Sequence, residues 1–132
     1  MKLKIKVASP SARKSYWLKF VGAPPMRQSE FAAATEVFLD TNDRIMCQEY
    51  AELWLLEVVK MFSQSHPDMF TKFVQNLGPA YLGMEIHKAQ IMEIIEKHKF
   101  DPSKNVLVQM MKKQVYELET VAKLRQMQTE KF

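Results

Sequence analysis

Residues 44–62, RIMCQEYAELWLLEVVKMF, decide how the rest of the chain is arranged. At about 100° per residue, most of their apolar side chains fall on one wide arc of a helix. The polar strip that remains holds only Gln48, Glu49, Glu52 and Lys60. A helix that is apolar most of the way round is enclosed by neighbours. We therefore expect a central helix over 44–62 within a small helical domain.

Leu56 departs from this pattern, because it falls within the polar strip near Glu49 and Glu52. A single exposed leucine is common and needs no special explanation. The alternative is that Leu56 contacts a second chain, since exposed apolar side chains also mark interaction sites. Both interpretations are open from the sequence, and Leu56 is retained as a candidate partner-binding residue.

The size and composition indicate one globular domain. The chain has 132 residues, of which 47% are hydrophobic and 26% are charged, as expected for a folded rather than a disordered protein. Cys47 is the single cysteine, which excludes an intrachain disulfide and favours a reducing, intracellular compartment such as the cytoplasm. No apolar run approaches the roughly 18 residues of a membrane span, so we expect none.

The N-terminal segment has a different pattern. In residues 1–7, MKLKIKV, the apolar Leu3, Ile5 and Val7 alternate strictly with three lysines, which is typical of a β-strand. Residues 15–21, SYWLKFV, also alternate. We expect a short β-hairpin or an extended basic arm over 1–25, followed by a helical domain over 26–132. The stiff Gly22-Ala23-Pro24-Pro25 sequence forms the connector between them.

Helix signals divide the remainder of the chain. Ser29, Pro67, Pro79 and Pro102 stand at expected helix starts, and short connections favour antiparallel neighbours. The predicted fold is mainly α, an antiparallel bundle of about five helices over 29–39, 44–62, 67–77, 79–98 and 102–130. In the last helix an apolar seam repeats at spacings of three and four: Val108, Met111, Val115, Leu118 and Ala122. Packing within the bundle is the favoured role of that helix, and contact with another copy is the alternative.

Residues with catalytic or metal-binding potential are scattered. His87 and His98 share a helix face but lie about 16 Å apart along the axis, which is too far for one metal. Paired carboxylates occur on solvated helix strips or at helix starts, where capping and solubility explain them. No phosphate-binding loop is present. We predict no catalytic residue, cofactor or metal; an enzyme is the least supported class.

The charge distribution is the strongest functional signal. Residues 1–29 contain seven basic and no acidic residues, whereas the rest contains 12 basic and 15 acidic ones. This asymmetry indicates an acidic or polyanionic partner. Our main hypothesis is a non-catalytic interaction subunit or assembly factor of a larger complex, docking through the basic segment. The alternative is RNA or DNA binding through residues 1–29, with aromatic side chains stacking on bases. The candidate partner-binding residues are Lys2, Lys4, Lys6, Arg13, Lys14, Trp17, Lys19, Arg27 and Leu56.

Overall fold

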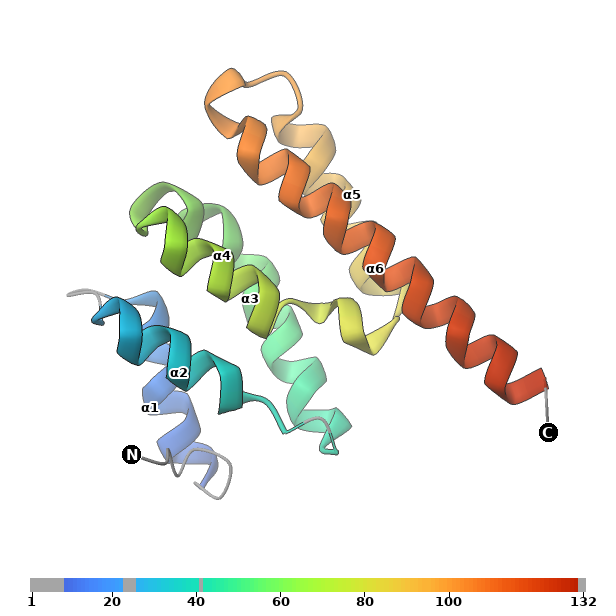
Figure 1. The fold of residues 1–132 in the computed structure, drawn as a ribbon, viewed down its shortest axis with the longest axis horizontal. Coiled ribbons are helices and arrows are strands. Elements are labelled where there is room, and N and C mark those ends of the chain that lie inside the picture. Colours follow the sequence, from blue (N-terminus) through green and yellow to red (C-terminus); the bar gives the residue numbers. More distant parts are fainter. Residues whose placement is uncertain (1–8, 23–25, 41, 131–132) are drawn as a thin grey trace.

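The computed structural model describes residues 9–22, 26–40 and 42–130. Within them lie six α-helices and two short 3-10 helices, and no strand (Figure 1). The helices are α1 (Pro10–Val21), α2 (Gln28–Phe38), α3 (Arg44–Gln64), α4 (Pro67–Leu77), η2 (Pro79–Leu82), α5 (Glu85–His98), η3 (Pro102–Lys104) and α6 (Asn105–Glu130). The prediction of a mainly α fold is confirmed.

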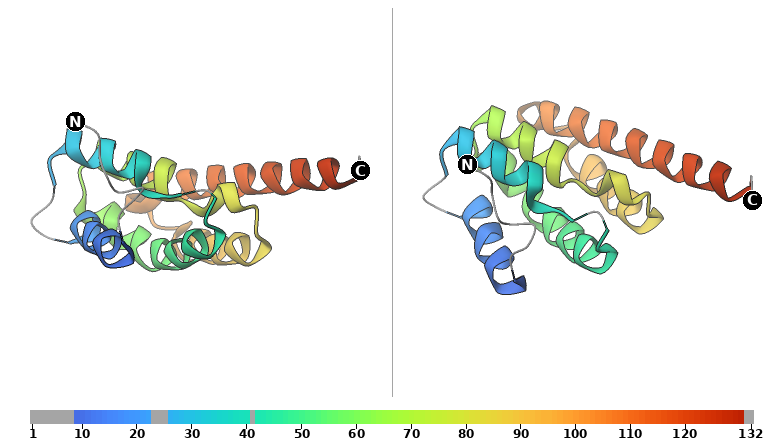
Figure 2. Two further views of the ribbon diagram at one scale, coloured as in Figure 1. Left: turned by 90° about the horizontal axis from the view of Figure 1, so that it is seen from below. Right: turned by 60° about the horizontal axis from the view of Figure 1, so that its bottom comes forward.

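The helices form two layers, with α1, α3 and α5 in one and α2, α4 and α6 in the other (Figure 2). Figure 1 shows the same arrangement face on, with α3 and α5 behind α4 and α6. The last turns of α6 extend past the other helices. The side chains described there, residues 123–128, are all exposed.

Helix α3 lies at the centre of the core, as its wide apolar arc predicts. Its Trp54 is fully buried and stacks on Phe73 of α4, with ring centroids 6.0 Å apart and planes inclined by 13°. The Trp54 Nε1–H donates to the Phe73 carbonyl oxygen at 3.2 Å. The indole therefore gains burial without leaving its polar N–H unsatisfied.

The predicted hairpin is wrong in its second strand, because residues 15–21 belong to helix α1. Ser9 is the N-cap, and its Oγ accepts a hydrogen bond from the Ala12 N–H at 3.3 Å; Pro10 occupies the first turn. The predicted first strand, residues 1–7, lies outside the described residues. The buried residues of α1 follow a helical spacing: Arg13, Trp17, Phe20 and Val21. The three apolar ones share one core with residues of the helices after residue 26.

The helix predicted over 79–98 is divided into η2 and α5. Gly83 separates them with φ +63° and ψ 26°, a left-handed conformation that glycine adopts without steric cost. A β-carbon at Gly83 would lie 3.2 Å from the Ala122 backbone nitrogen of α6. The break therefore allows the chain to reverse direction close against α6. The last predicted helix also starts differently, with η3 over Pro102–Lys104 before α6.

Polar side chains connect the helices within the core. Asn76 Nδ2 of α4 donates to Thr35 Oγ1 of α2 at 3.0 Å, and Thr35 Oγ1 donates to the Phe31 carbonyl at 2.9 Å. Gln114 Nε2 of α6 donates to the Val74 carbonyl near the end of α4 at 3.3 Å. Buried hydrogen bonds of this kind fix which parts of two helices face each other.

Candidate functional site

Helix α1 exposes a basic face, which we define as Lys14, Leu18 and Lys19. All three side chains are exposed, with Leu18 at 58% of its full accessibility. Among the described residues, no carboxylate lies within ion-pair distance of either lysine. Lys19 Nζ lies 5.1 Å from the centre of the Tyr16 ring. The basic face thus combines two cations available to a partner with one exposed apolar side chain.

Two of the predicted partner-binding residues are largely buried. Trp17 is 4% exposed, and its nearest rings are Tyr50 at 5.4 Å and Phe73 at 5.9 Å between centroids. Arg13 is 7% exposed, with its guanidinium carbon 6.0 Å from the centre of the Phe38 ring. Both belong to the core because the segment is a helix that packs on α2, α3 and α4. A surface role for Trp17 and Arg13 is therefore corrected to a structural one.

Four further predicted residues are Arg27, which the structure describes, and three lysines of the first seven residues. Arg27 is exposed and serves as the N-cap of α2, where its carbonyl accepts a hydrogen bond from the Phe31 N–H at 2.8 Å. Lys2, Lys4 and Lys6 lie outside the described residues. The structure accordingly brings Lys14 and Lys19 together on one helix, whereas Arg27 lies after the connector.

Leu56 lies on α3, outside the basic face, and is 78% exposed. It borders a groove of about 460 Å³ between α3 and α5. The groove is lined by Glu52, Leu55, Leu56, Gln90, Glu93, Ile94 and Lys97. The sequence prediction of an exposed Leu56 is confirmed, while its contact with another chain remains a prediction.

A second groove, of about 680 Å³, lies between α1 and the start of α3. It is lined by Pro10, Ser11, Arg13, Lys14, Asp40, Asp43, Ile45, Met46, Glu49 and Tyr50. We refer to it as the α1–α3 groove. The sequence does not predict this groove, because its two walls come from segments about 30 residues apart. The one available signal is Ile45, an apolar residue on the polar side of the helix expected over 44–62.

Buried titratable groups lie elsewhere in the core. Burial raises the pKa of the Cys47 thiol, and its Sγ donates to the Asp40 carbonyl at 3.2 Å. Burial lowers the pKa of His87, against the opposing effect of the Glu52 carboxylate. Cys47 is 1% exposed and therefore belongs to the core. Within the described ranges, no three His, Cys, Asp or Glu residues are grouped closely enough to hold a metal ion.

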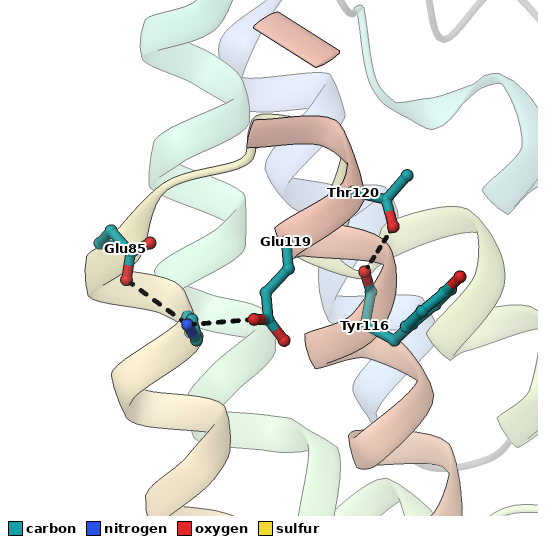
Figure 3. A network of polar contacts seen from close by, with 5 residues as sticks. Glu85, Tyr116, Glu119 and Thr120 are labelled. Atoms are coloured by element: carbon teal, nitrogen blue, oxygen red, sulfur yellow. Dashed lines mark hydrogen bonds and ion pairs between the residues drawn. The ribbon is translucent and has the colours of Figure 1, made fainter. Parts of the chain in front are cut away.

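Ion pairs lie on the surface where α5 meets α6 (Figure 3). Lys88 Nζ of α5 lies 3.4 Å from Glu119 Oε2 of α6 and 4.0 Å from Glu85 Oε2. On α6, Thr120 Oγ1 donates to the Tyr116 carbonyl at 2.9 Å. Exposed pairs of this kind contribute little stability, about 0–1 kcal/mol each. The Lys88–Glu119 pair joins α5 to α6, whereas the Lys88–Glu85 pair lies within α5.

The apolar seam predicted on the last helix is directed into the molecule. Val108, Met111 and Leu118 of α6 are buried against the rest of the chain. They are therefore unavailable for pairing with another copy. The exposed apolar side chains of α6 are different ones, including Tyr116, Leu124 and Met127.

None of the described helices has the length and apolar content needed to cross a membrane. Comparisons of the chain with protein-family models, with curated proteins and with solved structures found no match.

Proposed function

We propose that this chain is a non-catalytic helical subunit or assembly factor that docks through its basic N-terminal segment onto an acidic surface of a protein partner. The observation that carries the proposal is the basic face of α1. Lys14 and Lys19 flank Leu18 in a segment of 29 residues that contains no acidic residue. A protein surface with carboxylates around an apolar pocket would complement both the charges and the leucine.

The burial of the aromatic residues favours a protein over a nucleic acid. Stacking on bases needs exposed ring faces. Trp17 and Phe20 instead lie in the core, and Tyr16 is only partly exposed beneath Lys19. Leu18, the apolar side chain that α1 does expose, suits an apolar contact in a protein interface better than stacking on a base.

The test is affinity capture with the full chain, after nuclease treatment of the extract. A Lys14→Glu, Lys19→Glu variant should lose a partner that the unmodified chain retains, because two attractive contacts become repulsive. A matched control is Lys72→Glu, Lys112→Glu, which changes the net charge equally at exposed positions on α4 and α6. A Leu18→Ser variant should capture less of the same partner.

Two outcomes contradict the proposal. In the first, the variant and the charge-matched control capture equal amounts of every partner. In the second, the partner is captured only when nuclease treatment is omitted. The affinity of the chain for RNA or DNA then falls steeply with salt concentration, which identifies a polyanion as the ligand.

A further inference from the structure

The α1–α3 groove has walls of different character. Its α3 side presents the carboxylates of Asp40, Asp43 and Glu49. The same side presents Ile45, which is 82% exposed, together with the largely buried Met46. A partly apolar groove lined by three carboxylates is suited to an extended segment that is apolar on one side and cationic on the other.

The charge of this wall is opposite to that of the N-terminal segment. Residues 30–59 contain seven acidic residues and one basic residue, directly after the 29 residues that lack any acidic group. The α1 wall of the groove contributes Lys14 and Arg13, and Arg13 is largely buried beside Phe38. The negative charge of the groove therefore lies in the first turns of α3 and in the connection before it, where the lysines would meet it.

The chain itself contains a segment of this kind a few residues before the groove-lining residues in the sequence. Pro10 and Ser11 line the groove, and residues 2–7 precede them in the sequence. Seven extended residues reach about 23 Å. In the sequence Lys2-Leu3-Lys4-Ile5-Lys6-Val7, an extended backbone places the lysines on one side and the apolar side chains on the other.

We propose that the α1–α3 groove binds residues 2–7 of the same chain. The lysines of this segment face the carboxylates of Asp40, Asp43 and Glu49, and its apolar side chains cover Ile45. This inference rests on the proposed function in one respect. If the basic N-terminal segment is the docking element, an acidic partner competes with the groove for residues 2–7.

The test is zero-length cross-linking of the full chain with a carbodiimide, which joins a lysine amine to a carboxyl group in direct contact. Equal amounts of ¹⁴N- and ¹⁵N-labelled protein are mixed before the reaction, and the peptides are identified by mass spectrometry. The expected products are intrachain links from Lys2, Lys4 or Lys6 to the three carboxylates. The Lys99–Glu96 ion pair at 2.7 Å and the Lys88–Glu119 pair at 3.4 Å are internal positive controls.

Two variants keep every amine and carboxyl group in place. Leu3→Ser with Ile5→Ser and Val7→Ser removes the apolar side of the segment, and Ile45→Ser removes its counterpart in the groove. Both should lose the links to residues 2–7 while the Lys99–Glu96 link is unchanged. Leu56→Ser is the matched control for Ile45→Ser, because Leu56 is similarly exposed on α3 but lies at the other groove. It should leave the links unchanged.

Three results overturn the inference. Links between ¹⁴N and ¹⁵N chains would make a second copy the occupant of the groove. If the control pairs react and these links are absent, residues 2–7 do not bind in the groove. Links that persist in both serine variants would show charge attraction without a docked segment. No partner is present in the experiment, so its failure is distinct from a failure of partner capture.

Discussion

Replacement of Trp17 by alanine tests whether α1 belongs to the core or is an outward-reaching arm. Trp17 is 4% exposed and lies within about 6 Å of the Tyr50, Phe73 and Phe38 rings. A buried aromatic side chain removes about 150–250 Å² from water, which at about 25 cal/mol per Å² corresponds to roughly 4–6 kcal/mol. Alanine retains part of this, and aromatic-to-alanine changes in cores cost about 3–5 kcal/mol.

We therefore expect Trp17→Ala to lower the free energy of unfolding by about 3–5 kcal/mol. The measurement is urea denaturation followed by far-ultraviolet circular dichroism. Since domains of this kind are stable by only about 5–15 kcal/mol, Trp17→Phe provides a milder variant that should lose a smaller part and remain folded.

Leu18→Ala is the matched control, because its side chain is adjacent in sequence but exposed. Its effect should stay within about 0.5 kcal/mol. A loss below about 1 kcal/mol for Trp17→Ala, or equal losses for the two substitutions, would refute the packing of α1 described above. The basic segment would then have to be considered as an independent arm.

Three further predictions concern Gly83, His87 and Cys47. Gly83→Ala should lower the free energy of unfolding by about 1–2 kcal/mol, because an L-residue is strained at its positive φ; an unchanged thermal midpoint would contradict this. The unfolded chain protonates His87 near its usual pKa of 6.5, whereas burial lowers the pKa in the folded state, so stability should be full above pH 6.5 and decrease as the pH falls towards the folded-state pKa. Chemical denaturation at several pH values should show that His87→Gln removes this decrease. Cys47 should react slowly with a thiol reagent in the native protein and rapidly in urea, since burial raises its pKa; equal rates would place it at the surface.

The helices over 28–38, 44–64 and 67–77 could be predicted because their signals are local. Pro67 and Asp68 mark the start of α4, Gly78 follows its end, and the apolar arc of α3 is wide enough to identify a central helix. These features act within a few residues of one another. Knowledge of the tertiary packing was not needed to interpret them.

Helix α1 was missed because its sequence satisfies two periodicities. Tyr16, Leu18 and Phe20 alternate as a strand would, but the buried side chains are those at helical spacing. Ser9-Pro10 reads equally well as a break between strands and as the cap and first turn of a helix, and the structure shows the second. Neither periodicity prevails within the segment itself. The helical one prevails because it brings Trp17 and Phe20 into one cluster with rings from three other helices.

The candidate surfaces were less predictable than the helices. The net charge of the N-terminal segment indicated a binding region, but the sequence could not show that Arg13 would lie beneath the surface beside Phe38. Burial of a cation depends on which distant residues surround it. The α1–α3 groove likewise exists only after α1 has packed beside α3.

The position of α6 has a consequence for how the protein opens. Helix α6, which buries Met111 and Leu118, packs mainly against α5 and η2. Arg125 donates hydrogen bonds to the Tyr81 and Leu82 carbonyls of η2. We therefore expect η2, α5 and α6 to separate from α1–α4 as one cooperative unit, with loss of the Gln114–Val74 hydrogen bond, at less than the free energy of global unfolding. Amide protons in α6 would then exchange with solvent deuterium earlier than those of α3, although both helices are long and regular.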